Sequence, residues 1–437
     1  MTTFSRIALV AVFGLTLGGC TSGNSAPTCS FNDPARMPPT PGATPGSGSS
    51  WPKFRANVQN TGTVTNITVS MDAQIVKRFP ATGNPTGAFV ASPVLNNGES
   101  ALYIGSTDNT MYKLSTDPTQ DSTFLTQDTT FNLVAAQPIT STALVAVRDG
   151  QDAIFVGGAD GRLYGVTNTG DTQANYWPFA TGAYVSASPT IALTDGTLYV
   201  GAENGLFNAV CPNGIVRFGG TAQSIESSAA QDASSNIYVG ADDRQLRAFE
   251  YTGPLKWAFS ASAPIVTAPV VEENGSSTFV YTVDLGGRAF KVNASNGQPV
   301  ISFAFPSAMA PAAGPIASSP AMANGRLYFG SNDGNLYAIS TDDGSLQWTV
   351  HTGGPIVSSP AVAIGPTQTI VVVGSMDGNL YIVDDADPAA PTVVPLRISA
   401  DDPIEPIESS PAIGSDGTIY VGTDGNVKHG GGVYALR

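Results

Sequence analysis

The sequence is poor in charged residues, in cysteine and in histidine. Only 12% of its 437 residues are charged, and it contains three cysteines and two histidines. It has no Cys-x-x-Cys pair, no His-Glu-x-x-His motif and no histidine cluster, so we expect no transition-metal site. The formal net charge is -15. A chain this acidic repels phosphate backbones, which argues against nucleic acid as a partner.

The N-terminal apolar run is too short to cross a membrane. Ile7–Leu17 holds 11 residues, whereas a spanning helix needs about 20. The run follows Arg6 and leads into Leu17-Gly18-Gly19-Cys20, which resembles the bacterial lipobox. We therefore expect residues 1–19 to be a lipoprotein signal peptide and Cys20 to carry the lipid, the alternative being an ordinary secretory signal. The residue after Cys20 is Thr21 and not aspartate, which favours anchoring in the outer membrane over the inner membrane.

Residues 20–50 are rich in Pro, Gly, Ser and Thr and have little apolar surface to bury. We interpret them as an extended tether between the lipid and the folded domain. Export places the chain in an oxidising compartment, where Cys29 and Cys211 can form a disulfide. The alternative is that both thiols are free and that Cys211 is buried in a strand.

A repeated unit occupies the rest of the chain. Its clearest copy, Ser318–Val350, parses into four short strands separated by the hairpin turns ANG, SNDG and TDDG. Four strands with a period between 40 and 51 residues are typical of a propeller blade. Residues 51–437 are thus predicted to form an all-β, eight-bladed β-propeller of four-stranded antiparallel blades. The eight copies of the first strand begin at Ser92, Ser141, Ser188, Ser228, Ala268, Ser319, Ser359 and Ser410.

The last repeat lacks a fourth strand. An orphan strand of that type, Gln74–Ala81, precedes the first repeat. We expect it to complete the last blade and to close the ring, leaving no free sheet edge there. Aromatic residues recur on the fourth strands, and we assign them to packing between blades. They are Trp177, Phe218, Trp257, Phe303 and Trp348.

The recurrent SSPA, the LYFGSNDGNLYAI pattern, the DGSLQW strand and the opening WPKFRANVQNTG resemble the PQQ-like (quinoprotein-type) propeller repeat family. One branch of that family holds dehydrogenases that use pyrroloquinoline quinone (PQQ) and Ca²⁺, often with adjacent cysteines that cap the cofactor. This chain has no adjacent cysteines and mostly minimal blades. It is closer in type to a second branch of non-enzymatic envelope propellers, which includes the lipoprotein of the outer-membrane barrel-assembly machinery.

Two surfaces are candidates for contact with a partner. Lys428 and His429 lie in the irregular loop TDGNVKHGGG of the last blade. Aspartates recur in the loops between second and third strands, where a ring of carboxylates would attract Ca²⁺ or a basic segment. The alternative is that each one only stabilises its own turn. The five candidates are Asp108, Asp160, Asp333, Asp377 and Asp424.

The sequence favours a non-catalytic, lipid-anchored, monomeric scaffold of the cell envelope with a protein partner, possible roles being outer-membrane protein assembly or surface organisation. We predict no catalytic residue, no metal site and no cofactor. A PQQ-dependent dehydrogenase of alcohols or sugars, which would use PQQ and Ca²⁺, is the first alternative. A glycan-binding propeller is the second.

Overall fold

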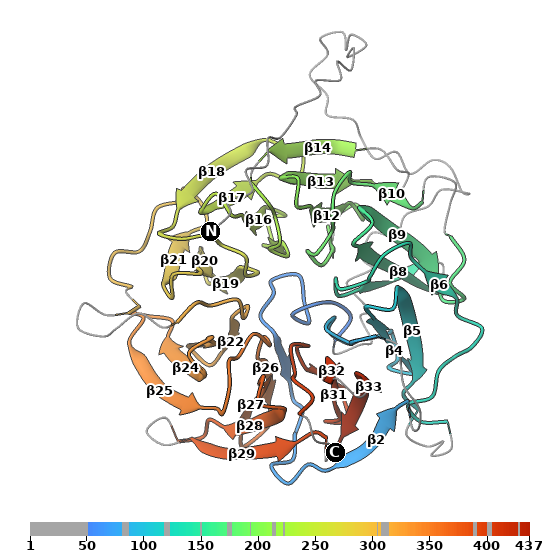
Figure 1. Ribbon diagram of the computed structural model, residues 1–437. Helices are drawn as coiled ribbons and strands as arrows, with labels where there is room; N and C mark the ends of the chain where they lie inside the picture. Colours follow the sequence, from blue (N-terminus) through green and yellow to red (C-terminus); the bar gives the residue numbers. More distant parts are fainter. Residues whose placement is uncertain are drawn as a thin grey trace, which may run out of the picture.

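The eight repeats form a ring of blades around a central axis (Figure 1). The described residues contain strands and no helix, so nothing among them is a helix of the length and apolarity needed to span a membrane. The predicted all-β propeller is confirmed. The computed structural model describes residues 51–80, 87–117, 123–148, 151–172, 177–192, 194–211, 216–221, 223–303, 305–306, 314–387, 391–399, 404–426 and 429–437.

Blades 1 to 4 each contain four antiparallel strands, the fourth lying at the outer edge of the ring (Figure 1). These strands are β3 (Val94–Leu95), β4 (Ala101–Gly105), β5 (Thr110–Ser115) and β6 (Leu133–Val134) in blade 1; β7 (Leu144–Arg148), β8 (Gln151–Gly158), β9 (Arg162–Thr167) and β10 (Phe179–Ala180) in blade 2; β11 (Thr190–Ile191), β12 (Leu198–Gly201), β13 (Leu206–Val210) and β14 (Val216–Thr221) in blade 3; and β15 (Ala230–Gln231), β16 (Ile237–Gly240), β17 (Gln245–Phe249) and β18 (Leu255–Ser260) in blade 4.

Blades 5 to 8 vary this plan. In blade 5 two isolated bridges, Val292 with Pro299 and Ala289 with Phe305, stand where the outer strand runs in the other blades. The strands are β19 (Val270–Asn274), β20 (Ser277–Val283) and β21 (Ala289–Asn293) in blade 5; β22 (Ala321–Ala323), β23 (Arg326–Gly330), β24 (Asn335–Ser340) and β25 (Leu346–His351) in blade 6; β26 (Ala361–Ile364), β27 (Thr369–Gly374), β28 (Asn379–Asp384) and β29 (Thr392–Arg397) in blade 7, with β1 (Thr63–Thr65) added in parallel to β26; and β30 (Ala412–Ile413), β31 (Ile419–Gly422), β34 (Val433–Leu436) and β2 (Ile75–Phe79) in blade 8.

The last blade is completed by an N-terminal strand, as the sequence predicts. β2 pairs antiparallel with β34, and the register sets Phe79 opposite Val433 and Ile75 opposite Leu436. A strand that precedes the first blade in sequence is therefore the hydrogen-bonded neighbour of the last strand in one sheet. This arrangement closes the ring without leaving the edge of β34 unpaired.

The hydrophobic core lies between neighbouring blades. One cluster of buried side chains joins Val94 and Tyr103 of blade 1 to Val145 and Ile154 of blade 2. The tryptophans of the fourth-strand column, among them Trp348, are also buried. A single blade buries only a small area alone, so the stacking of blades supplies most of the hydrophobic stabilisation.

The glycine that ends the second strand allows this close stacking. A Cβ atom on Gly330 would lie 2.1 Å from Cγ2 of Ile356, which belongs to the next blade. Gly240 stands in the same relation to Ile265, at 2.3 Å, and Gly374 to Ile407, also at 2.3 Å. Only a residue without a Cβ fits there, which accounts for the glycine column in the repeats.

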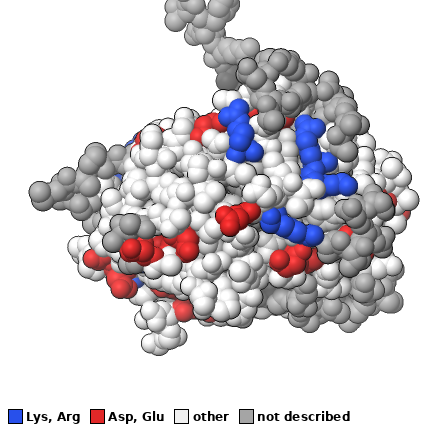
Figure 2. Space-filling model, turned by 90° about the horizontal axis from the view of Figure 1, so that it is seen from below, with Lys and Arg blue, Asp and Glu red and all other residues white. Residues whose placement is uncertain are grey.

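The edge of the ring beside β29 and β2 carries few charges (Figure 2). Figure 2 shows the edge beside β29 and β2, where basic and acidic side chains are scattered among uncharged ones without a large patch of one sign. The charge of -15 is therefore not gathered on this visible edge.

Candidate functional site

The Ser-Pro motif builds a ring of hydrogen bonds around the propeller axis, which we call the hydroxyl ring. In seven blades the residue before proline, or the residue at the equivalent position, accepts a hydrogen bond through its hydroxyl. The donor is the backbone N–H at the same repeat position in the preceding blade. The N–H to hydroxyl distances are 2.9–3.1 Å. Blade 5 carries Ala268, which has no hydroxyl, and interrupts the ring once. The seven hydroxyls belong to Ser92, Thr142, Ser188, Ser228, Ser319, Ser359 and Ser410.

The first serine of a Ser-Ser pair binds its own blade and the next one; Ser358, for example, donates a 3.0 Å hydrogen bond from its hydroxyl to the carbonyl of Ser409 in the next blade. The hydroxyl of Ser318 accepts a hydrogen bond of 3.0 Å from the N–H of Gly330, and Ser358 does the same for Gly374 at 3.1 Å. The first serine therefore links strands of its own blade as well as neighbouring blades, and the second serine links neighbouring blades. Both roles are structural, which explains why the motif recurs around the ring.

Residues 51–62, which we call the axial segment, run through the centre of the ring (blue in Figure 1). Backbone carbonyls of this segment accept hydrogen bonds of 2.7–2.9 Å from inner-strand N–H groups in six blades. Residues 63–65 then form β1 beside β26 of blade 7. The pairs are Trp51 with Leu95, Pro52 with Val145, Val58 with Gln231, Gln59 with Val271, Thr61 with Met322 and Gly62 with Val362.

Two cations of the axial segment are fully buried. Lys53 donates from Nζ to the carbonyls of Phe54 and Asn57 and to Oδ1 of Asn60. Arg55 donates to the carbonyls of Pro320 and Pro360, the prolines of two Ser-Pro motifs.

Burial shifts the protonation of both groups. Loss of hydration, with a smaller contribution from the charge of Arg55, lowers the pKa of Lys53 to about 7. Burial lowers the pKa of Arg55 to about 9. These cations are thus held by neutral oxygens in a low-dielectric environment.

A cavity of about 240 Å³ remains on the axis beside the axial segment, and Phe54 forms part of its wall. It is lined by the residues of the hydroxyl ring and, in each blade, by the residue two positions earlier in the sequence. Two of these residues are carboxylates, Glu226 in blade 4 and Glu408 in blade 8, on opposite sides of the ring. Burial raises the pKa of both, and the nearby charges of Asp242 and Glu203 add to the effect on Glu226.

Sequence reasoning missed these two glutamates. They occupy a column of the repeat that elsewhere holds small or apolar residues, for example Val90 and Ala317. Aligning the repeats on the Ser-Pro motif shows that the two acids are four blades apart, half of the ring. That spacing is the signal in the sequence that points to opposed carboxylates.

None of the five candidate aspartates belongs to the wall of this cavity, and four of them accept a hydrogen bond from a tyrosine four residues further on. Asp377, for example, accepts 2.6 Å and 2.9 Å hydrogen bonds from the hydroxyl of Tyr381 and the N–H of Asn379. Burial of Asp377 opposes its ionisation, but these hydrogen bonds and others outweigh it and lower its pKa. Asp108, Asp160 and Asp333 accept a hydrogen bond from a tyrosine four residues on in the same way.

Asp424 differs from the other four. Its Oδ1 atom is buried and finds no hydrogen-bond partner among the residues that the structure describes. Burial, with a smaller contribution from the charge of Glu408, raises the pKa of Asp424 to about 7. This aspartate is therefore coupled to the cavity through Glu408.

The candidate contact loop and the cysteines are only partly described. His429 begins the short strand β33 (His429–Gly430), which pairs with β32 (Gly425–Asn426), while Lys428 lies outside the described residues. Cys211 takes part in a disulfide bond. Cys20 and Cys29 lie outside the described residues, as do the signal peptide 1–19 and the tether 20–50, so the pairing of Cys29 with Cys211 stays a prediction.

The residues around the axial cavity do not fit PQQ with Ca²⁺. PQQ is a planar tricarboxylate, so its site needs cations and flat surfaces for stacking. The described lining contains no Lys, Arg, Trp or Tyr, and its two glutamates would repel an anion. In the described part of the chain, no group of three or more His, Cys, Asp or Glu side chains is arranged to hold a metal ion.

Residues 274–427 match the model of a protein family described as outer membrane protein assembly factor BamB. The repeats are similar to those of PQQ-like propellers. The matched part of this chain runs from the end of β19 into blade 8.

Solved structures from two functional classes share the fold. BamB from Moraxella catarrhalis is 15% identical with a TM-score of 0.59, over 84% of this chain and 97% of that chain. A europium-containing methanol dehydrogenase is 13% identical with a TM-score of 0.66, over 89% and 98%. Quinohemoprotein alcohol dehydrogenase from Comamonas testosteroni is 13% identical with a TM-score of 0.65, over 90% and 80%. At these identities the likeness concerns the fold alone.

One curated relative matches a short stretch of the chain. It is the beta-alanine-activating enzyme of Danio rerio, 32% identical over 77 residues. The match covers 17% of this chain and 7% of the relative. It therefore concerns a small part of a much longer protein.

Proposed function

We propose that this PQQ-like propeller is a non-catalytic scaffold of the bacterial envelope that holds a protein partner during outer-membrane protein assembly. The family model that it matches describes an assembly factor, and BamB shares its fold. In this proposal residues 1–19 are removed, the lipid on Cys20 anchors the chain in the outer membrane, and residues 20–50 are the tether.

The occupation of the axis by the axial segment is the observation that carries the proposal. A catalytic pocket needs space and side chains that are free to act on a substrate. Here backbone carbonyls from Trp51 to Gly62 fill part of the axis, and the seven hydroxyls beside it already bind the neighbouring blades. These groups stabilise the ring, so the function is expected on the loops and edges of the ring.

A rigid ring suits a scaffold because it holds its loops at fixed positions. The partner would be an envelope protein, and the charge of -15 favours a partner with a basic contact surface. The closed ring is expected to act as a monomer, because β2 covers the edge of β34 that would otherwise recruit a second chain. No bound cofactor is required for this role.

Site-specific photo-crosslinking in intact cells tests the proposal. A photoreactive residue would replace exposed residues on each face, beginning with Asn332 between β23 and β24 and Asp342 between β24 and β25. We expect one face to give a reproducible adduct with an envelope protein. The adduct should be lost in Cys20→Ser, which removes the lipid. If scanning both faces gives no envelope adduct from a folded, membrane-bound chain, the proposal is wrong.

A quinoprotein dehydrogenase is the second candidate, because two alcohol-oxidising enzymes share the fold with TM-scores of 0.66 and 0.65. The purified chain, shown to be folded, would be titrated with PQQ and Ca²⁺ while tryptophan fluorescence and dye-linked alcohol oxidation are followed. We expect a flat titration and no turnover. Saturable quenching together with turnover would replace the scaffold proposal by an enzyme.

A further inference from the structure

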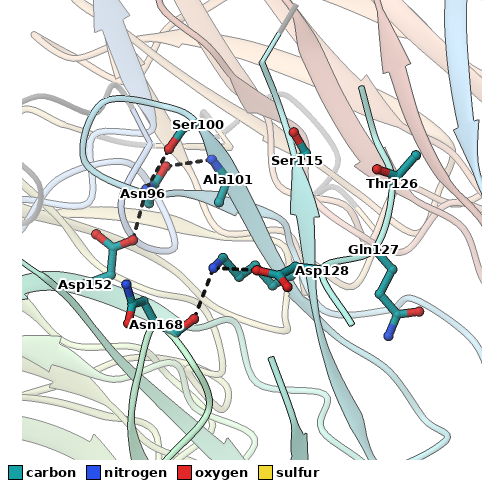
Figure 3. A pocket seen from close by; sticks show the side chains of 10 residues that line it. Asn96, Ser100, Ala101, Ser115, Thr126, Gln127, Asp128, Asp152 and Asn168 are labelled. Carbon is teal, nitrogen blue, oxygen red and sulfur yellow. Dashed lines mark hydrogen bonds and ion pairs between the residues drawn. The ribbon is translucent and has the colours of Figure 1, made fainter. Parts of the chain in front are cut away.

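A polar pocket of about 360 Å³ lies between blades 1 and 2 (Figure 3), and none of its lining residues borders the axial cavity. Its walls come from the turn between β3 and β4, from β5 and the loop that follows it, and from β8 and the turn after β9 in the next blade. In each blade the turn between the first and second strands lies at one end of the strands. The aspartate loops between the second and third strands lie at the other end, so this pocket and those loops are on opposite faces of the ring. The volume is in the range of small-ligand sites, about 300–1,000 Å³.

Asp152 of blade 2 is fixed at one side of this pocket. Its Oδ2 atom accepts hydrogen bonds from Nδ2 of Asn96 at 2.9 Å and from the hydroxyl of Tyr103 at 3.3 Å, both in blade 1. Burial raises the pKa of Asp152. Its Oδ1 atom accepts no hydrogen bond within the described residues, so it can receive one from a ligand.

Lys113 is fixed at the other side. Its Nζ atom lies 2.8 Å from Oδ2 of Asp128 and donates a 3.1 Å hydrogen bond to the carbonyl of Asn168 (Figure 3). Hydrogen bonds from Lys113 and Thr130 lower the pKa of Asp128 to about 2, so the ion pair persists at neutral pH. An ammonium group has three N–H donors, which leaves one for a ligand.

The remaining wall is also rich in hydrogen-bonding groups. The side-chain amides of Gln127 and Asn168 make no hydrogen bond within the described residues, and Ser115 adds a hydroxyl. Each amide offers both donors and an acceptor. Ala101 is the sole apolar side chain of this lining.

This composition selects one ligand class. An apolar ligand would find no apolar wall, and an anion would meet two carboxylates against one ammonium. The described part of the chain has no cluster of three acidic, His or Cys side chains for a metal ion. A hydroxyl group can both donate to Asp152 and accept from Lys113 or an amide, so a molecule with several neighbouring hydroxyls can use the whole wall.

We propose that the pocket between blades 1 and 2 binds a neutral sugar through Asp152, Lys113, Asn168 and Gln127. The proposal does not depend on the scaffold function, because it rests on a different part of the ring. The wall has no aromatic platform to stack on a sugar ring, so binding is expected to be weak and to depend on hydrogen bonds.

A titration of the full-length chain tests the proposal. The ligands are glucose, galactose, N-acetylglucosamine and maltose, and binding is measured by NMR or calorimetry. At least one sugar should bind saturably. Asp152→Asn, which can still accept from Asn96 and Tyr103, should weaken binding about tenfold or more, since it removes a charged acceptor. Gln127→Ala alters an exposed side chain and should weaken it several-fold. Asp333→Asn, in a distant loop, should bind as the wild type does.

Three outcomes would overturn the assignment. One is that none of the four sugars binds a chain shown to be folded by circular dichroism. Another is that a sugar binds equally well to Asp152→Asn and to the wild type, which places it elsewhere. The third is that a primary amine such as putrescine binds in an Asp152-dependent way while the sugars do not, which makes the pocket a cation site.

Discussion

The backbone N–H of Ser410 in the last blade donates a hydrogen bond of 3.1 Å to the hydroxyl of Ser92 in the first. These residues are 318 positions apart in the chain, and their contact completes the hydroxyl ring where the propeller closes. β2 closes the same gap at the outer edge through β34. The ring is thus joined at two radii, near its axis and at its rim.

Removal of the Ser92 hydroxyl should weaken this closure. Ser92→Ala leaves the N–H of Ser410 without its acceptor in a buried position, so we expect a loss of about 1–3 kcal/mol in the free energy of unfolding. Denaturant-induced unfolding measures it.

The natural gap at Ala268 provides the matched opposite experiment. Ala268→Ser would supply a hydroxyl to the N–H of Ser228, at a position that borders the axial cavity and so has room for it. We expect a gain of about 0.5–1 kcal/mol in the free energy of unfolding. If Ala268→Ser does not raise the free energy of unfolding and Ser92→Ala does not lower it, the hydroxyl ring does not stabilise the fold.

Lys53 should make stability increase with pH above neutrality. Its pKa is about 7 in the folded chain and about 10.5 when hydrated, so between these values the unfolded state binds more protons. The free energy of unfolding should therefore rise from about pH 7 to about pH 10. Lys53→Met, compared by denaturant unfolding across that interval, should show a flatter pH dependence. An equal slope in both proteins contradicts the shift.

Asp424 should act in the opposite direction. Its pKa of about 7 in the folded chain lies above the hydrated value of 3.8. Its contribution to the free energy of unfolding is therefore fully present below about pH 4 and is lost as pH rises through about 7. Asp424→Asn should raise the melting temperature at pH 8 and leave it nearly unchanged at pH 4. Asp342→Asn, an exposed aspartate, is the control and should change neither value.

Gly330 should not tolerate a side chain. Gly330→Ala would place a Cβ 2.1 Å from Cγ2 of Ile356, and the resulting shift of blade 7 against blade 6 should cost about 1–3 kcal/mol. Adding Ile356→Ala removes the nearest clashing atom and leaves Cβ of residue 356, at 2.6 Å, as the closest one, so the double variant should be more stable than the two single losses predict. Simple additivity in unfolding experiments would show that the two residues are not coupled.

The blades and their closure could be predicted from the sequence because each blade carries its own turns and strand pattern. The orphan strand at residues 74–81 was recognisable since the last repeat ends after its third strand. The path of the axial segment could not be predicted. Its contacts with the blades use mainly backbone carbonyls, which leave no residue pattern, and Arg55 reaches Pro360 across 305 residues.

The sites were less accessible to sequence reasoning than the fold. The aspartate loops stand out in the repeat, but Asp108, Asp160, Asp333 and Asp377 accept hydrogen bonds within their own loops. Glu226 and Glu408 are single exceptions in a column of small residues, and only the circular arrangement makes them face each other. The pocket at Asp152 arises where non-repeated loops of two blades meet, which no single repeat encodes.

The axial segment also constrains the order of folding during synthesis. Residues 51–62, which leave the ribosome early, bind inner strands as late as Val362, and β2 needs Leu436, the penultimate residue. Contacts this distant in sequence form slowly, because the loops that they close are long. The first part of the domain must therefore wait for the last, and a chain interrupted before its final strand leaves β2 without the strand that it pairs with.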